Sequence, residues 1–505
     1  MLNIRKGDIR LLVIIVSAAF VAVSLVGSVV SAKPTSSGIY KNSASLIQEC
    51  SACHGGNGSG PIGVHVPRID GMNAGYLVHA MRSMASGTWK SPIMSPIAMS
   101  LTGAQMQIVA SYFSTKSLTY LAGTKAHKGE VEGWLLGTRG DWKRKIPACT
   151  QCHGDRGVGI GRRFPRLEGQ QAAYIRSQIH AWRIGTRHDD PLGLMRNVAN
   201  RLDRRQIKEV SWYFSELPKV SKMAGGGSVG SVRGFVDSRG KFIPPANDVL
   251  PPGPFGRVVR LGENIFIHTS SYTHRYSGNA LSCENCHIDA GRLANSAPMW
   301  AAYVMYPAYR RKSGQVNTFA QRLQDCFRYS LNGTAPTRRS KVLLALESYS
   351  YFLANGAPTG RNLSGRGYPS LESPLHGMSY TRGRLVFRNY CSVCHGKDGQ
   401  GRLTSSGRQG FPPLWGKSSF NWGAGMANIE VVARFIKANM PLGLGGTLTP
   451  QQAWDVAKFV DSHERPQDPR FNGSVSSTRA KYHDNPLSMY GKRVNGLRLG
   501  DPLDR

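Results

Sequence analysis

The longest apolar run of the chain lies near its N-terminus, from Leu11 to Val30, and basic residues precede it at positions 5, 6 and 10. This run ends in Ser31-Ala32 before Lys33-Pro34, so residues 1–32 have the charged start, apolar centre and small-residue cleavage site of an export signal. The run also approaches the roughly 20 residues that span a bilayer, so an uncleaved membrane anchor stays an alternative. No later segment is long and apolar enough to span. We therefore expect the other residues to lie in a bacterial periplasm.

Proline, glycine and aromatic positions repeat over two stretches, residues 38–120 and 128–218. The first copy contains Pro67-Arg68, Gly71, Tyr76, Gly87-Thr88, Leu101 and Tyr112-Phe113, and the second contains Pro165-Arg166, Gly169, Tyr174, Gly185-Thr186, Leu202 and Tyr213-Phe214. Self-similarity of this kind indicates a duplicated structural unit. It predicts two small helical lobes, lobe 1 and lobe 2, each closed by a helix that carries the Tyr-Phe pair.

A glycine- and proline-rich stretch, residues 219–255, follows the second copy and lacks the apolar periodicity of a packed element. Such a composition is typical of a linker. Two further lobes are expected beyond it, lobe 3 at residues 256–365 and lobe 4 at residues 375–465. The tail at residues 466–505 is polar and punctuated by proline, which predicts a wrapping segment or disorder.

Four Cys-x-x-Cys-His strings use eight of the nine cysteines. This is the pattern of c-type haem attachment, in which both thiols bond the haem and the adjacent histidine binds its iron. Little is left for a zinc site or a disulfide framework. The sequence predicts four covalently bound haem c groups, which replace most of the apolar core of each small lobe. The attachment cysteines are Cys50, Cys53, Cys149, Cys152, Cys283, Cys286, Cys391 and Cys394, and the proximal ligands are His54, His153, His287 and His395.

The formal net charge of +34 could indicate a nucleic-acid partner. Export and four haem groups argue against this, and we expect no nucleic acid. A basic exported surface is suited to acidic redox partners, anionic headgroups or a small anionic substrate. General solvated charge is an equal alternative for most of these lysines and arginines.

Each repeat offers one well-placed methionine on the far side of its haem, Met94 in lobe 1 and Met195 in lobe 2. A thioether ligand opposite histidine raises the reduction potential of a haem. Methionine is more often core filler, but both candidates share the same distance to the Tyr-Phe pair. Met99 is the competitor of Met94.

Lobe 3 has no obvious methionine placed as in lobes 1 and 2, but it contains the ninth cysteine, Cys326. A free cysteine is usually a small buried hydrophobe. In an exported protein it invites oxidation unless it has a partner, and a ferric haem is such a partner. A thiolate ligand would lower the potential of that haem, and the neighbouring Arg322 and Arg328 would favour the thiolate.

The first half, roughly residues 38–218, resembles the dihaem cytochromes c built from two class I lobes, through its haem strings, Pro-Arg segments and Tyr-Phe helices. Residues 256–465 resemble the dihaem thiosulfate dehydrogenase family. The matching strings are Leu261-Gly-Glu-Asn-Ile, residues 279–287, Tyr306-Pro-Ala-Tyr-Arg310, Arg322-Leu-Gln-Asp-Cys326-Phe-Arg, Pro413-Leu-Trp415-Gly, residues 420–426 and Phe435-Ile-Lys-Ala-Asn-Met440-Pro-Leu-Gly443. The fold class implied is all-α, with four class I cytochrome c-like lobes arranged as two dihaem halves.

The resemblance implies that Cys326 is the distal ligand of the third haem. For the fourth haem Met440 is the candidate ligand and Met426 its rival. Some members of the family have a lysine directly before this methionine and exchange the two ligands, but Asn439 occupies that place here. Plain histidine–methionine ligation is the simpler expectation.

The reaction implied is the coupling of two thiosulfates to tetrathionate with release of two electrons. Two dianions repel one another unless cations surround them, and basic residues flank Cys326. Arg322 and Arg328 are the expected substrate cations, because they lie within about one helical turn of Cys326, and Ser330 is a further hydrogen-bond donor. The other candidate cations are Arg310, Arg311, Lys312, Arg338 and Arg339.

The expected mechanism bonds the Cys326 sulfur transiently to one thiosulfate, and a second thiosulfate then attacks that bond. The fused first half would pass the electrons to an external acceptor such as a soluble cytochrome, a copper protein or a terminal oxidase. Two other functions stay open, a tetrathionate reductase that uses the same site and a non-catalytic electron conduit. A haem peroxidase fits less well, because the ligand assignments leave no open iron position.

Overall fold

The computed structural model describes residues 43–61, 65–118, 130–217, 233–238, 240–245, 250–310, 312–404 and 407–501. The predicted export signal lies outside these ranges. Helices dominate, and the strands form four short two-stranded antiparallel pairs. Among the described helices, none has the length and apolar character needed to cross a membrane.

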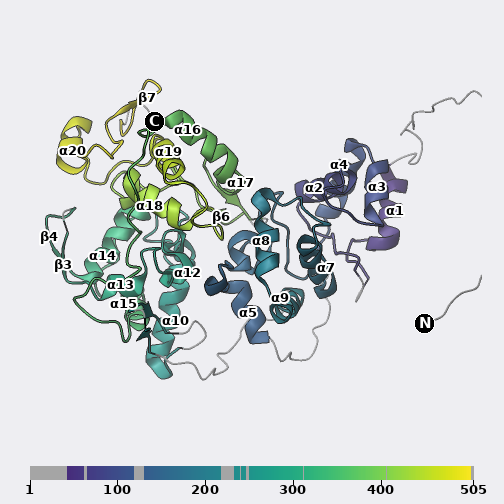
Figure 1. Ribbon diagram of the computed structural model, residues 1–505, viewed down its shortest axis with the longest axis horizontal. Coiled ribbons are helices and arrows are strands. Elements are labelled where there is room, and N and C mark those ends of the chain that lie inside the picture. Colours follow the sequence, from purple (N-terminus) through teal and green to yellow (C-terminus); the bar gives the residue numbers. More distant parts are fainter. Residues whose placement is uncertain are drawn as a thin grey trace, which may run out of the picture.

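Lobe 1 lies at one end of the molecule and lobe 2 near its middle (Figure 1). Each has its own core, around Phe113 in lobe 1 and around Phe214 in lobe 2. The helices of lobe 1 are α1 (Ser43–His54), α2 (Ala74–Ala85), α3 (Met94–Ser100) and α4 (Gly103–Ser114). Those of lobe 2 are α5 (Glu130–Thr138), α6 (Cys149–His153), α7 (Ala172–Arg183), α8 (Leu194–Arg201) and α9 (Arg204–Glu216).

The two lobes pair through the same repeat positions. The backbone N–H of Lys90 donates to Thr186 at 2.8 Å, and that of His188 donates reciprocally to Thr88 at 2.8 Å. Between them the buried Arg187 guanidinium lies 3.4 Å from the ring centre of Trp89 and 4.0 Å from that of Trp182. Asp189 accepts from Arg187 at 2.8 Å, which neutralises the buried cation. This junction fixes the two lobes against one another.

The predicted linker is packed in part. Its strands β1 (Phe235–Val236) and β2 (Phe242–Ile243) form a hairpin whose Phe242 is buried against Trp300 of lobe 3. The Arg292 guanidinium donates to the Pro245 carbonyl at 2.6 Å. The second part of the stretch predicted as linker also begins α10, at Gly253. The C-terminal part of the linker therefore belongs structurally to the second half.

Lobes 3 and 4 share one continuous hydrophobic core. The elements of lobe 3 are α10 (Gly253–Ile267), α11 (Thr269–Tyr272), α12 (Ile288–Gly291), α13 (Met299–Tyr303), β3 (Ala308–Arg310), β4 (Gln315–Asn317), α14 (Phe319–Asp325), η5 (Cys326–Ser330) and α15 (Lys341–Leu353). Those of lobe 4 are α16 (Tyr380–Val386), η6 (Phe387–Cys391), α17 (Ser392–His395), β5 (Arg402–Leu403), β6 (Gln409–Phe411), α18 (Ile429–Asn439) and α19 (Pro450–Asp461). Short 3₁₀ turns join several of these elements.

The first and last helices of lobes 2, 3 and 4 cross at a glycine. A Cβ atom on Gly133, Gly262 or Gly383 would collide with a carbonyl oxygen of the partner helix, at Glu209, Ala345 and Asp455 respectively. Only a residue without a side chain allows these helices to approach so closely. In lobe 2 the first helix of this crossing also contacts α6, which carries the Cys-x-x-Cys-His string.

The C-terminal tail packs against lobe 4, so of the two expectations the wrapping segment describes it. It contains α20 (Val475–Tyr482) and the hairpin of β7 (Arg493–Val494) and β8 (Leu497–Arg498). Tyr490 is fully buried and meets Trp422 with ring centres 5.7 Å apart. The Ile429 N–H donates to Leu487, which ties the tail to the start of α18.

Candidate active site and haem centres

The four proximal histidines have the same surroundings. The Nδ1 atom of each lies within hydrogen-bond distance of a backbone carbonyl, and because a carbonyl only accepts, Nδ1 carries the proton. Nε2 is then left as the lone-pair donor that binds a metal. The pairs are His54 with Pro67 at 3.0 Å, His153 with Pro165 at 2.8 Å, His287 with Ala297 at 2.7 Å and His395 with Pro412 at 2.9 Å.

Burial keeps these rings neutral. It lowers the pKa of His153 and of His287 to about 4, although the carbonyl hydrogen bond acts in the opposite direction. A neutral imidazole with a fixed tautomer is the form that binds iron, so the histidine side of each site fits a haem.

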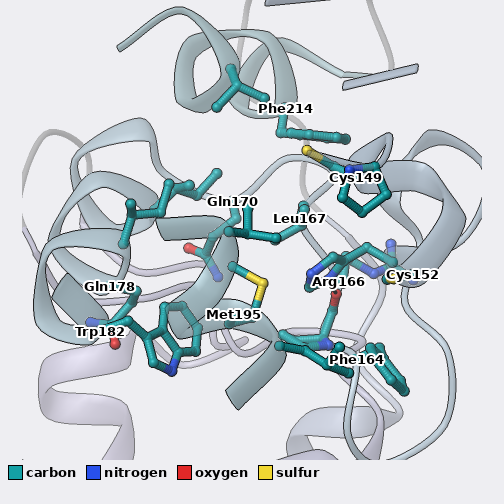
Figure 2. Close-up of a pocket in the computed structure, with 18 of the residues that line it drawn as sticks. Cys149, Cys152, Phe164, Arg166, Leu167, Gln170, Gln178, Trp182, Met195 and Phe214 are labelled. Carbon is teal, nitrogen blue, oxygen red and sulfur yellow. Dashed lines mark hydrogen bonds between the residues drawn. The ribbon is translucent and has the colours of Figure 1, made fainter. Parts of the chain in front are cut away.

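Two cavities contain the attachment residues of lobes 2 and 4. The lobe 2 cavity is lined by Cys149, Cys152, His153 and, from the opposite side, Met195. Figure 2 shows Met195 across this cavity from Cys152, with Arg166 between them in this view. The histidine and thioether face a mostly apolar space, which is the environment that a haem requires. The residues present therefore fit the group.

The lobe 4 cavity is lined by Cys391, Cys394, His395 and both candidate thioethers, Met426 and Met440. Because both methionines line this cavity, its lining does not show which of them is the ligand. The preceding residue Asn439 is buried and donates to Asn295 of lobe 3 at 3.3 Å and to Phe435 at 3.1 Å. Asn439 therefore fixes the chain at the point where Met440 begins.

Exposure separates the candidates in lobe 1. Met94 is half-buried and packs against the lobe 1 core, whereas Met99 is 69% exposed. Met94 is the methionine that the fold directs inward, as the repeat predicts.

Cys326 lies where α14 ends and a π-helical turn, η5, begins. Thr318 and Gln321 form a capping box that starts α14. One extra residue in the turn re-aims the side chains that follow, and such turns are frequent at functional sites. The charge of the half-buried Cys326 also raises the pKa of Cys283 and Cys286, after the larger effect of burial. Cys326 thus shares its surroundings with the haem attachment residues of lobe 3.

Arg322 contacts Cys326 directly. Its guanidinium donates to the Cys326 Sγ at 3.1 Å. The negative charge of that sulfur raises the pKa of Arg322, and burial opposes it. A guanidinium at this distance stabilises a thiolate, because charge-assisted hydrogen bonds are the stronger ones. The sequence expectation for Arg322 therefore has a defined geometric basis.

The other predicted residues differ in their placement. Arg328 donates to Asp325 at 3.2 Å and is 47% exposed at its side chain, so it is directed away from Cys326. Ser330 ends the π-helical turn, half-buried. Arg310 lies in β3 and is half-buried, Arg338 and Arg339 are exposed, and Arg311 lies outside the described residues.

Lys312 lies at the edge of the site, where the residue as a whole is exposed. Its ammonium donates to the Gly423 carbonyl and lies 3.7 Å from the ring centre of Tyr329. Burial lowers its pKa to about 7, and the positive charges of Arg322 and Arg470 act in the same direction.

Sequence reasoning missed Arg470, which the tail contributes. Asp468 holds the Arg470 guanidinium at 2.6 Å and accepts from His483 at 2.9 Å. Arg470 also lies 5.2 Å from the ring centre of Tyr329, three residues beyond Cys326. No signal in the sequence places it there, because the tail approaches lobe 3 only through folding.

The haem sites of the two halves adjoin. Gln151, inside the haem string of lobe 2, donates to Glu284, inside that of lobe 3, at 3.1 Å. Cys152 and Cys394 both pack against a small apolar cluster in which Phe164 and Phe411 lie 5.1 Å apart. A buried ion pair at 3.0 Å joins Arg139 of lobe 2 to Glu263 of lobe 3.

Two family models match the second half of the chain. The SoxA/TsdA cytochrome c domain matches residues 270–359, and subunit III of the cbb3-type cytochrome c oxidase matches residues 379–460. A thiosulfate dehydrogenase of Thiomonas intermedia is 53% identical over 270 residues, which are 54% of this chain and 86% of that relative. The chain belongs to the thiosulfate dehydrogenase family.

The first half has relatives of its own. A thiosulfate dehydrogenase electron acceptor of Thiomonas intermedia is 41% identical over 170 residues, covering 34% of this chain and 78% of that protein. The solved structure of the thiosulfate dehydrogenase TsdBA from Marichromatium purpuratum, in its as-isolated form, spans both halves. It is 41% identical with a TM-score of 0.82 and covers 90% of this chain and 95% of its own.

These likenesses confirm the predicted fold class and the predicted resemblance. The chain is a mostly helical enzyme of the thiosulfate dehydrogenase family, built from cytochrome c domains that bind haem c covalently. Its first half is related to a thiosulfate dehydrogenase electron acceptor.

Proposed function

We propose that this protein oxidises two thiosulfates to tetrathionate in the periplasm and passes the electrons through four haem c groups to an external acceptor. The observation that carries the proposal is the hydrogen bond from Arg322 to Cys326 in a member of the thiosulfate dehydrogenase family. When bound, the haem groups take up the two electrons one at a time.

The Cys326 sulfur takes the covalent part of the reaction. In the first step the thiolate and the terminal sulfur of one thiosulfate form an S–S bond and give up two electrons, which haem groups held by His287 and His395 would accept. In the second step another thiosulfate attacks that bond, tetrathionate leaves and the Cys326 thiolate returns. The two steps sum to two thiosulfates giving one tetrathionate and two electrons, with no proton released or consumed.

Arg322 acts in both steps. Its hydrogen bond holds Cys326 as the nucleophilic thiolate at the start and stabilises the same thiolate as leaving group at the end. Lys312 and Arg470 add positive charge nearby, which offsets the repulsion between two dianions.

The contacts between the halves support an internal electron route. Lobe 2 contacts lobe 3 through Gln151 and Glu284, and lobe 4 through Phe164 and Phe411. Tyr76 of lobe 1 lines the cavity of lobe 2. Electrons from lobes 3 and 4 would thus enter lobe 2 and leave through lobe 1 to a soluble cytochrome, a copper protein or a terminal oxidase.

The direct test combines substrate and product assays on the full chain. Thiosulfate should reduce ferricyanide in the presence of the enzyme, with one tetrathionate formed for every two ferricyanides, and a haem assay should give four haem groups per chain. A rate of tetrathionate reduction higher than the rate of thiosulfate oxidation, at equal driving force, would instead support a reductase. Absence of both reactions would support a non-catalytic conduit.

A further inference from the structure

An uncharged apolar face covers one side of lobe 1. Ile93 is 70% exposed, Ile97 38% and Met99 69%, and all three lie on α3 or directly before it. The sequence has no charged residue from Ser91 to Thr115, although the chain carries a net charge of +34. Contiguous apolar surface on a highly charged protein marks an interaction site.

The repeat shows what this face does in lobe 2. Leu194 is the counterpart of Ile93, and it packs into the apolar cluster that joins lobe 2 to Phe411 of lobe 4. Arg201, at the end of α8, donates to Gly443 of lobe 4 at 3.2 Å. In lobe 2 the helix that carries the distal methionine is therefore a contact surface for another haem lobe.

The second attachment cysteine of each lobe shows the same difference between a packed position in lobe 2 and an exposed one in lobe 1. Cys152 packs into the junction with lobe 4, close to Cys394. Its counterpart in lobe 1, Cys53, is exposed. Leu194 and Cys152 of lobe 2 thus contact lobe 4, whereas their counterparts in lobe 1, Ile93 and Cys53, are exposed. Lobe 1 lies at the end of the molecule away from lobes 3 and 4 (Figure 1).

We propose that the face formed by Ile93, Ile97 and Met99 of lobe 1 is the docking surface for the external electron acceptor. The acceptor would be a small one-electron carrier protein that presents an uncharged apolar face around its own redox centre. It would contact lobe 1 as lobe 4 contacts lobe 2. The charges point to this partner, because residues 91–115 offer no cation to an acidic carrier and no anion to a basic one, and the cation Lys90 only borders them beside Met99. The inference rests on the proposed exit of electrons through lobe 1.

The test measures how fast the reduced full-length enzyme is reoxidised by a soluble blue-copper protein whose copper edge is apolar. Ile93→Glu should lower the second-order rate constant by at least about tenfold, because a buried charge at the centre of an apolar contact is costly. Leu344→Glu, at a lobe 3 position that is 55% exposed, is the matched control and should stay within about twofold. Ile93→Gln should give an intermediate loss.

Two further measurements isolate docking. Reoxidation by ferricyanide, which needs no apolar docking surface, should change by less than about threefold in Ile93→Glu. The wild-type rate with the copper protein should vary by less than about twofold between about 50 and about 300 mM salt, because apolar contact is not screened. A wild-type rate with the copper protein in Ile93→Glu, or an equal loss with ferricyanide, would overturn the proposal.

Binding of wild type, but not Ile93→Glu, to phosphatidylcholine–phosphatidylglycerol vesicles, with an unchanged copper-protein rate, would assign the face to a membrane and also overturn it. Reduction by dithionite in place of thiosulfate keeps the test independent of catalysis. Failure of thiosulfate to reduce the wild type would count against the proposed function alone.

Discussion

The four predicted haem sites agree on one side and diverge on the other. On the proximal side each histidine is held by a backbone carbonyl at 2.7 to 3.0 Å. On the opposite side lobes 1, 2 and 4 offer methionine, whereas lobe 3 offers Cys326 with the Arg322 guanidinium upon it. The comparison between lobes 2 and 3 teaches that one scaffold serves both electron transfer and catalysis. The distal residue and its charged neighbours make the difference.

Cys326→Met places in lobe 3 the methionine that the other lobes offer opposite their histidine. This variant should have the largest effect on activity. We expect the full haem content to be kept and kcat/KM for thiosulfate to fall by at least about 10³-fold, because the nucleophile is lost. The potential of one haem should rise. Steady-state ferricyanide reduction and a redox titration measure both. Activity within about tenfold of wild type would remove Cys326 from the mechanism.

Arg322→Gln keeps the cysteine and removes the cation that contacts its sulfur. The expected loss in kcat/KM is about 10- to 100-fold, since a hydrogen bond to a charged group contributes about 1.5–3 kcal/mol. Arg328→Gln is the matched control, because Arg328 pairs with Asp325 at the surface, and it should cost less than about threefold. Equal losses in the two variants would mean that the contact at Cys326 is not what matters.

The pKa of Lys312 predicts a pH dependence that belongs to lobe 3. Burial lowers that pKa to about 7, so the ammonium is charged below this pH and neutral above it. The KM for thiosulfate should therefore rise by about two- to fivefold from about pH 6 to about pH 8, as an attractive charge is lost. In Lys312→Met the KM should be high and flat over this range. The same slope in both proteins would assign it to another group.

Ionic strength should have the smallest effect. Salt screens the long-range attraction of thiosulfate to the basic chain, and we expect a decrease in kcat/KM of about two- to threefold between about 50 and about 300 mM salt. The ratio of wild type to Arg322→Gln should persist, because short buried contacts are screened less. Lys208→Gln, at an exposed position far from lobe 3, should behave as wild type. A ratio that collapses in salt would place Arg322 at long range.

The sequence reveals those features that are local or repeated. A Cys-x-x-Cys-His string holds both thiols and the iron ligand within about one turn, so the attachment sites can be found without a fold. The duplication distinguishes Met94 from Met99, because Met195 has the same distance to its Tyr-Phe pair. Cys326 stands out because every other cysteine already has a partner.

Features formed by segments distant in sequence could not be predicted. The order of residues does not show that Arg322 contacts Cys326 while Arg328 is exposed and pairs with Asp325, since the direction of the Arg328 side chain depends on the π-helical turn in which it lies. Arg470 reaches Tyr329 only after the polar tail has folded around buried residues such as Tyr490. The contact of Gln151 with Glu284 joins two strings that are far apart along the chain.

The hairpin of β1 and β2 shows that the connection between the halves is anchored on the catalytic side through Phe242. In Thiomonas intermedia the dehydrogenase and the electron acceptor are separate relatives, so their encounter depends on how much of each is present. A short tether sets an effective concentration of about millimolar, whatever the abundance of the protein. Electron hand-over between the halves is therefore insensitive to dilution, and an external electron carrier would be the one partner whose abundance affects turnover.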